Sequence, residues 1–214
     1  MKIPISEIKK IAKKRLDKGA SCHSWDHAER VLKKALLIGT EEGADLAVVT
    51  TAALFHDIKK TEEMRSKKKI CHAVDGAKET RKILTKLKLP QKFINQVSHC
   101  IKAHRFRNDI SPQTIEAKVL SDADKIDSLG AVGIGRAFLY VGKVGARLHN
   151  SEVKNILKTK EFGPDDTLFR GYMVKLCHLP RGMYTKTGKK IARERALYIK
   201  KFINRLEKEI AGKL

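Results

Sequence analysis

The chain has 214 residues, and 42% of them are hydrophobic, so it can bury a sizeable core and is not a disordered polypeptide. Its 46 basic residues against 24 acidic ones give a net charge of +22, which attracts anions such as phosphates, nucleic acids or acidic lipid headgroups. Four single cysteines, with no Cys-x-x-Cys pair, argue against a disulfide framework and against a cysteine zinc site.

The basic residues are spread along the whole chain rather than gathered in a tail or an arginine-rich tract. Aromatic residues make up only 6% of the chain and are not clustered, so they form no base-stacking platform. This pattern favours a solvated, lysine-rich surface over a dedicated nucleic-acid groove. No apolar stretch reaches the length of a signal peptide or a membrane span, so we expect a cytoplasmic protein with no membrane partner.

Apolar residues recur at helical spacing along most of the chain. In residues 28–36 they repeat every three or four positions, which predicts a helix with one face on a core. Residues 46–55 are nearly all small or apolar, which predicts a central helix covered on most sides. Stripes in residues 94–104 and 191–210 predict two more amphipathic helices. Because no alternating strand pattern occurs, we expect an all-α bundle.

Short breaks separate these segments. Pro90, Pro112 and residues 163–166 indicate loops or helix starts. The sequence contains no internal repeat and no low-complexity linker. We therefore expect one domain over residues 1–214, in which C-terminal helices in residues 165–214 pack on the core.

Two histidines and an aspartate fall at the ends of predicted helices. His27 lies on an apolar face, so its ring should point inward, although a lone inward histidine is more often a core residue than a ligand. His56 and Asp57 close the most buried helix. An aspartate there meets the negative end of the helix dipole, and its burial is costly without a cation. A metal ion removes both penalties, whereas an ion pair with Lys59 or Lys60 would leave His56 unexplained.

An aspartate-rich segment, residues 121–127, follows these residues in the chain. Its three carboxylates cannot all be ligands of one ion. On a helical wheel of residues 120–134, Asp127 falls inside the apolar stripe, Asp124 lies on its edge and Asp122 projects from the other side. The periodicity favours Asp124 or Asp127 as a metal ligand, with the remaining acid orienting a histidine.

The order of these residues resembles the HD-domain superfamily of metal-dependent phosphohydrolases. Further matches spread over residues 20–205, and together they resemble the small stand-alone branch of that superfamily. The residues that carry the resemblance are Trp25–Asp26–His27 with Arg30–Val31, His56–Asp57 within residues 53–60, His72 before Gly76–Ala77, Ala103–His104–Arg105, Ala123–Asp124–Lys125–Ile126–Asp127 within residues 121–135, and residues 185–195.

This resemblance implies an α-helical HD domain that binds one divalent metal ion. The implied ligands are His27, His56, Asp57 and Asp124. His72 and His104 match positions that line the pocket in related members, where they contact phosphate or a second metal. Family members hydrolyse phosphomonoesters, phosphodiesters or nucleotide pyrophosphate bonds, and the small branch includes nucleoside triphosphate pyrophosphatases. We therefore expect a small phosphorylated substrate, foremost a nucleotide.

The chemistry of the implied ligands is consistent with this function. Mixed imidazole and carboxylate ligands suit Mn, Fe, Co, Ni or Zn better than Mg, which prefers oxygen alone. Such an ion polarises a phosphoryl oxygen and lowers the pKa of a bound water. Asp57 or Asp127 is expected to accept the proton of that water, and Lys60 to stabilise charge on the phosphate. The expected substrate-binding side chains are His72, His104 and Arg105.

The chain departs from the family pattern just after the His–Asp pair. Lys59 stands where the family commonly has glycine, so the exit of the helix after Asp57 is expected to differ. Residues 61–69 are expected to form the rim of the pocket. Glu62 or Glu63 of this rim could reach the site, although charged side chains in a loop are usually only solvated.

Three functions remain open. The leading one is a metal-dependent phosphohydrolase that acts on a nucleotide or a similar small phosphate. The second is a nucleic-acid-associated phosphodiesterase, or a basic RNA- or DNA-binding protein with a structural metal, whose affinity would fall steeply with salt. The third is a non-catalytic helical bundle with a buried polar network, which metal analysis of the purified protein would separate from the other two.

Overall fold

The computed structural model describes residues 3–16, 24–66, 69–105, 110–150 and 152–214. Within these ranges the secondary structure is helical and contains no strand, which confirms the all-α class. No helix in the described parts is both long enough and apolar enough to cross a membrane. Cys71, Cys100 and Cys177 are free thiols, whereas Cys22 lies outside the described residues.

The chain divides into two compact units. The first contains residues 1–124 together with Tyr184–Gly188, and the second contains Lys125–Met183 together with Lys189–Leu214. The single domain expected over residues 1–214, with residues 165–214 packed on its core, stays a prediction.

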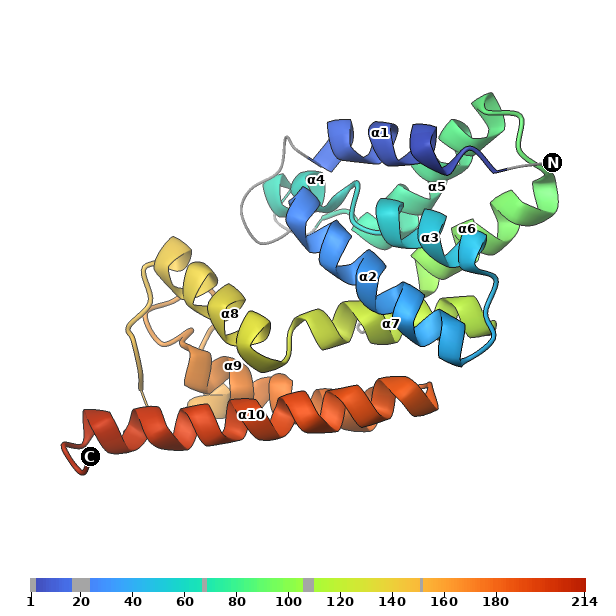
Figure 1. The fold of residues 1–214 in the computed structure, drawn as a ribbon. Helices are drawn as coiled ribbons and strands as arrows, with labels where there is room; N and C mark the ends of the chain where they lie inside the picture. The colour runs from blue at the N-terminus through green and yellow to red at the C-terminus, as the bar shows by residue number, and fades with distance from the viewer. Residues whose placement is uncertain (1–2, 17–23, 67–68, 106–109, 151) are drawn as a thin grey trace. The chain divides into compact units, whose positions relative to one another are not determined.

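The first unit is organised around one buried helix, α3, which contacts α1, α2, α5 and α6 (Figure 1). Side chains of this helix are buried on nearly every side, which confirms the central helix predicted for residues 46–55. The helices of this unit are α1 (Ile5–Leu16), α2 (Trp25–Glu41), α3 (Leu46–Phe55), α4 (Lys60–Arg65), α5 (His72–Lys86), α6 (Gln91–Ala103) and most of α7 (Ile115–Asp127).

Local sequence sets the ends of α3. The carboxylate of Asp45 accepts hydrogen bonds from the backbone N–H groups of Ala47 and Val48, at 2.9 and 3.2 Å, and so caps the first turn. The run of small and apolar residues that follows ends at His56, which occupies the C-cap. The helix therefore delivers His56 and Asp57 to the middle of the unit.

The predicted apolar stripe of residues 94–104 forms the inner face of α6, which packs against α5. Phe93, Ile94, Val97 and Ile101 are buried on this face. His104 continues the stripe as the C-cap of the helix and is itself buried. The helix therefore carries a histidine ring into the interior, as its spacing predicts.

The second unit contains the long amphipathic helix predicted near the C-terminus, with Ala192, Ile199 and Ile203 buried. A polar cluster supports the segment before α9, because Arg170 donates to Asp166 at 2.9 Å and to the carbonyl oxygen of Thr159 at 2.8 Å. The elements of this unit are α8 (Gly130–Val144), η1 (Ile156–Lys158), α9 (Leu168–Val174), η2 (Leu176–Gly182) and α10 (Lys186–Ile210), whose first turn belongs to the first unit.

The helical wheel of residues 120–134 spans a break that the periodicity does not predict. Helix α7 ends at Asp127, and α8 begins at Gly130. Gly130 has φ +71°, a left-handed conformation that interrupts the helix and favours glycine. The assumption of one continuous helix through residues 120–134 is therefore wrong, although the helical wheel holds for the part that lies within α7.

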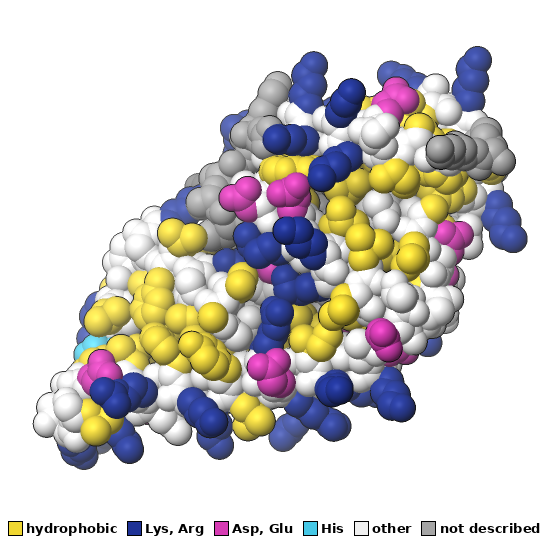
Figure 2. Space-filling view, in the orientation of Figure 1, with side chains coloured by type: hydrophobic (Ala, Val, Ile, Leu, Met, Phe, Trp, Pro, Cys, Tyr) yellow, Lys and Arg dark blue, Asp and Glu magenta, His cyan; other side chains and the backbone are white. Residues whose placement is uncertain are grey.

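Lysine and arginine side chains are dispersed over the visible face of the molecule, with acidic side chains among them (Figure 2). Many of these side chains lie on α1 and α10, two helices with polar outer faces. This distribution agrees with the scattered basic residues of the sequence.

Candidate metal centre

Four histidines and two aspartates come together inside the first unit. Five of the six residues are buried, and the side chain of Asp124 is 29% exposed. Helix ends supply most of them: His27 lies in the first turn of α2, His56 caps α3 and is followed by Asp57, His72 opens α5, His104 caps α6, and Asp124 lies in the last turn of α7.

The first cluster consists of His27, His56 and Asp124. The Nε2 atoms of the two histidines lie 3.2 Å apart, and Asp124 Oδ1 is 3.4 Å from the Nε2 of His27. Two imidazole nitrogens that bind one ion at about 2.1 Å lie roughly 3 to 3.5 Å apart. The spacing of these atoms is therefore that of ligands sharing an ion. One oxygen of Asp57, Oδ2, is 3.6 Å from His27 Nε2 and 3.7 Å from His56 Nε2.

The second cluster consists of Asp57, His72 and His104. Here the two Nε2 atoms also lie 3.2 Å apart. The other oxygen of Asp57, Oδ1, is 3.2 Å from His72 Nε2 and 3.8 Å from His104 Nε2. Asp57 therefore presents one carboxylate oxygen to each pair of histidines.

Two of the imidazoles are oriented by the helices that they cap. The Nδ1 atom of His56 is 2.8 Å from the carbonyl oxygen of Ala53, and that of His104 is 2.6 Å from the carbonyl oxygen of Ile101. A carbonyl oxygen in the last turn of a helix lacks an intrahelical partner and can only accept. Each Nδ1 therefore donates its proton to the backbone, and each Nε2 keeps a lone pair for a ligand.

A third imidazole, His72, is oriented by a carboxylate. Its Nδ1 lies 2.9 Å from Glu63 Oε2. Glu63 is only 2% exposed, so of the two alternatives for Glu62 and Glu63 this residue is the one that reaches the site rather than a solvated side chain. The neighbouring Glu62 instead lies near the surface and pairs with Lys59 at 3.1 Å. The spacing of Lys60 and Glu63 could have indicated the place of Glu63, because residues three apart lie on one face of a helix and can form an ion pair.

The local electrostatics favour the protonation states that bind a cation. Burial, helped by the neighbouring His56 and His72, lowers the pKa of His104 to about 3. Burial opposes the ionisation of Asp124, but the hydrogen bond with His27 and the nearby imidazoles outweigh it and hold the pKa of that carboxyl well below its usual range. His104 is therefore neutral and Asp124 ionised near pH 7, as metal ligands must be.

This donor set fits a divalent metal ion. Imidazole nitrogens with free lone pairs converge with two carboxylates in a buried site, which is ligand chemistry for Mn, Fe, Co, Ni or Zn rather than for Mg. The residues implied as ligands by the family resemblance lie together in the first unit: His27, His56, Asp57 and Asp124.

Lys60 and Arg105 lie beside the second cluster, and both pair with Glu63. Lys60 Nζ is 2.7 Å from Glu63 Oε2 and 3.4 Å from His72 Nδ1. Arg105 Nη1 is 3.1 Å from Glu63 Oε1 and 3.2 Å from the sulfur of Cys71. The structure thus places Lys60 and Arg105, the two basic side chains expected at the phosphate, on the His72 side of the site.

The other two aspartates of α7 have different partners. Asp127 is fully buried and pairs with Arg136 at 2.9 Å, and both residues belong to the second unit. Asp122, which the wheel placed on the opposite side of the helix, is also fully buried, because it accepts hydrogen bonds from Tyr184 and Thr185. Of the three acids in this segment, Asp124 is the one in the first cluster.

The stability of the metal-free protein should fall as the pH is lowered. His104 has its pKa lowered from 6.5 to about 3 in the folded state, so between these values the unfolded chain holds the extra proton. The stabilisation is complete above pH 6.5 and is lost toward pH 3, by about 1.4 kcal/mol per pH unit for one proton. The lowered pKa values of Asp124 and Glu63 act with the same sign at lower pH. Urea unfolding in EDTA between pH 7 and 4 measures this slope, and a flat or opposite profile would contradict it.

Comparison with known proteins places these residues in a family. A model of the HD domain matches residues 24–129. The uncharacterised protein YpgQ of Bacillus subtilis is 32% identical over 200 residues, which are 90% of this chain and 87% of that protein. The chain belongs to the HD-domain family. A crystal structure of YpgQ in complex with ADP superposes with a TM-score of 0.73 at 31% identity, over 96% of this chain and 94% of the other.

Two further relatives show the range of the family. An HD-superfamily hydrolase from Bacillus thuringiensis has a TM-score of 0.74 at 29% identity, over 97% of this chain and 96% of the other. Ribonuclease Y of Thermoanaerobacter pseudethanolicus is 34% identical over 104 residues, which are 48% of this chain and 18% of that protein. Family membership and the hydrolase relatives support a metal-dependent phosphohydrolase.

Proposed function

We propose that this HD-domain protein hydrolyses a phosphoester or phosphoanhydride bond of a nucleotide at a centre that binds two metal ions. The observation that carries the proposal is the position of Asp57, whose two carboxylate oxygens face two separate pairs of histidine Nε2 atoms. A structural network would not require every one of these imidazoles to converge on one aspartate. The ADP complex of YpgQ supports a nucleotide as the ligand.

Asp57 would bridge the two ions. His27, His56 and Asp124 would hold the first ion, and His72 and His104 the second. When bound, a pair of such ions polarises phosphoryl oxygens and supplies a hydroxide nucleophile near neutral pH. This arrangement gives His72 and His104 the role of ligands rather than direct contacts to phosphate.

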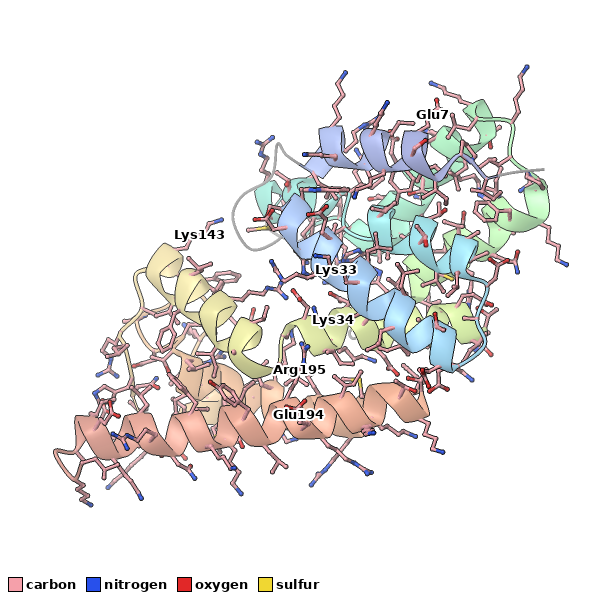
Figure 3. The ribbon with its side chains drawn as sticks, viewed as in Figure 1. Glu7, Lys33, Lys34, Lys143, Glu194 and Arg195 are labelled. Atoms are coloured by element: carbon pink, nitrogen blue, oxygen red, sulfur yellow. The ribbon has the colours of Figure 1, made fainter. Side chains whose placement is uncertain are left out.

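Basic side chains lie beside His72 and on the helix that carries His27. Lys60 and Arg105 lie beside His72, where they would stabilise charge that develops on phosphate oxygens. Helix α2 carries Arg30 and Lys34 three and seven residues after His27, on the same face of the helix. Figure 3 shows Lys34 on this helix, where its ammonium group donates to the carbonyl oxygen of Arg30 at 3.2 Å. These two residues would contact further phosphate groups of a nucleotide.

The two residues expected as proton acceptors have different surroundings. Both carboxylate oxygens of Asp57 face histidine pairs, whereas Asp127 Oδ2 pairs with the guanidinium group of Arg136. We therefore assign Asp57 the role of a metal ligand and Asp127 that of a structural ion pair.

A second candidate function is the cleavage of a phosphodiester in nucleic acid. The net charge of +22 and the partial match to ribonuclease Y favour it. Binding of an RNA or DNA backbone would weaken steeply as salt is raised, whereas a mononucleotide that neutralises fewer charges would respond less.

A substrate screen tests the leading function. Metal-stripped protein reconstituted with Mn²⁺ should release phosphate or pyrophosphate from at least one nucleoside mono-, di- or triphosphate, and EDTA should abolish the activity. Chromatography of the products identifies the bond that breaks. Cyclic dinucleotides and a short RNA serve as competing substrates. Cleavage of RNA alone would transfer the assignment to the second function, and turnover that persists in EDTA would contradict both.

A further inference from the structure

We propose that Glu63 is a positioning residue that prepares His72 to bind the second ion and sets the charge beside it. This inference rests on the two-ion centre proposed above. The activity of the centre does not by itself require a buried glutamate on α4, and the family resemblance does not single one out. The argument depends on the hydrogen bonds that surround this carboxylate and on the place of His72 in its helix.

The Glu63 carboxylate is enclosed by donors on both oxygens. Oε2 lies 2.9 Å from His72 Nδ1 and 2.7 Å from Lys60 Nζ. Oε1 lies 3.1 Å from Arg105 Nη1 and 3.4 Å from the backbone nitrogen of His72. These donors come from α4, from α5 and from the residue that follows the His104 cap of α6. One buried side chain therefore joins three segments around the second cluster.

His72 needs such a partner because of its position in a helix. His56 and His104 are C-caps, so the carbonyl oxygens of the preceding turn orient their rings. His72 is the first residue of α5, where the free backbone groups are N–H donors rather than carbonyl acceptors. The acceptor for its Nδ1–H must come from elsewhere, and Glu63 provides it. The proton is thereby held on Nδ1, and the Nε2 lone pair faces Asp57 and His104.

Glu63 also controls the charge next to the second cluster. Lys60 and Arg105 bring two positive charges close to His72, and both would repel a divalent cation. The Glu63 carboxylate cancels one of these charges and holds both side chains in fixed positions. The site can therefore keep cations for a phosphate substrate without losing affinity for the metal.

The adjacent residue provides a matched control. Glu62 lies on the same short helix and also pairs with a lysine three residues earlier, Lys59, at 3.1 Å. Its side chain is 45% exposed, whereas that of Glu63 is 3% exposed. Glu62→Gln removes the same charge from the same helix and leaves His72, Lys60 and Arg105 with their partner.

The test compares wild-type protein, Glu63→Gln and Glu62→Gln by titration of the metal-free full chain with Mn²⁺. A glutamine has the shape of glutamate but accepts on only one of its two terminal atoms, so it cannot satisfy both His72 and Arg105. In Glu63→Gln the second Mn²⁺ should bind roughly 10- to 100-fold more weakly, as for other partners that orient a metal ligand. The first ion should bind as before. The electron paramagnetic resonance signal of a spin-coupled Mn²⁺ pair should weaken in parallel, while Glu62→Gln retains it.

The possible results separate this inference from the function on which it depends. If wild-type protein binds a single Mn²⁺, the two-ion centre fails and the role of Glu63 fails with it. If wild-type protein binds two ions and Glu63→Gln binds the second as tightly as Glu62→Gln does, only the role of Glu63 is overturned.

A measurement on the wild-type protein covers the case in which Glu63→Gln does not fold. In metal-free protein, ¹⁵N NMR of the imidazole should find the His72 proton on Nδ1. A proton on Nε2 would overturn the inference.

Discussion

Replacing Asp57 with asparagine should remove both metal ions and lower the rate of phosphate release roughly a thousandfold or more. The residue faces His27 and His56 with one oxygen and His72 and His104 with the other. An amide offers only one acceptor, and its NH₂ group would face one of the two histidine pairs. The substitution also removes the negative charge that the two ions would share. Both clusters therefore lose affinity from a single change.

Metal content by mass spectrometry and product release measure this effect. Circular dichroism should show unchanged helix content, because Asp57 lies just after α3 rather than within it. Asp75→Asn is the matched control: Asp75 lies on α5, pairs with Lys78 at 3.2 Å and belongs to neither cluster. If Asp57→Asn loses one ion and binds the other with wild-type affinity, Asp57 is a ligand of one site and not a bridge.

Local patterns in the sequence predict the part of the site that depends on helix ends. The buried run of α3 predicts where His56 and Asp57 lie, and the stripe of α6 predicts the inward direction of His104. In both cases the information is contained within a few turns of one helix. The convergence of His27 with His56 required the family resemblance, because the two residues are 29 positions apart.

The sequence does not predict features whose partners lie in other segments. In the sequence, Glu63 resembles the charged residues of a solvated loop. Its burial becomes favourable because His72 and Arg105, which lie in later segments, pair with its carboxylate. The break between α7 and α8 depends on the positive φ of Gly130, which a helical wheel does not represent. Asp122 lies on the polar side of the wheel, yet it is covered by Tyr184 and Thr185, which are more than 60 positions later in the chain.

Asp122 and Asp124 should therefore differ in their effect on metal binding when each is changed to alanine. Asp122 Oδ2 accepts from the backbone N–H of Thr185 at 2.8 Å and from its hydroxyl at 2.7 Å, and Oδ1 accepts from the N–H of Tyr184 at 3.0 Å. These bonds fix the start of α10, where the hydroxyl of Thr185 in turn accepts from Gly188 at 2.9 Å. A Cβ atom on Gly188 would lie only 2.5 Å from Asp122 Oδ2, so this turn can lie close to the Asp122 carboxylate only with glycine at position 188.

Asp122→Ala should lower the free energy of unfolding by about 3 kcal/mol, because it leaves buried donors of Thr185 without an acceptor. It should leave Mn²⁺ binding intact. Asp124→Ala should remove the first ion, since Asp124 Oδ1 lies 3.4 Å from His27 Nε2. Urea unfolding in EDTA and Mn²⁺ titration measure the two effects separately. Loss of metal in Asp122→Ala with retention in Asp124→Ala would reverse the assignment. The metal ligand would then be Asp122, the carboxylate that accepts hydrogen bonds at the start of α10.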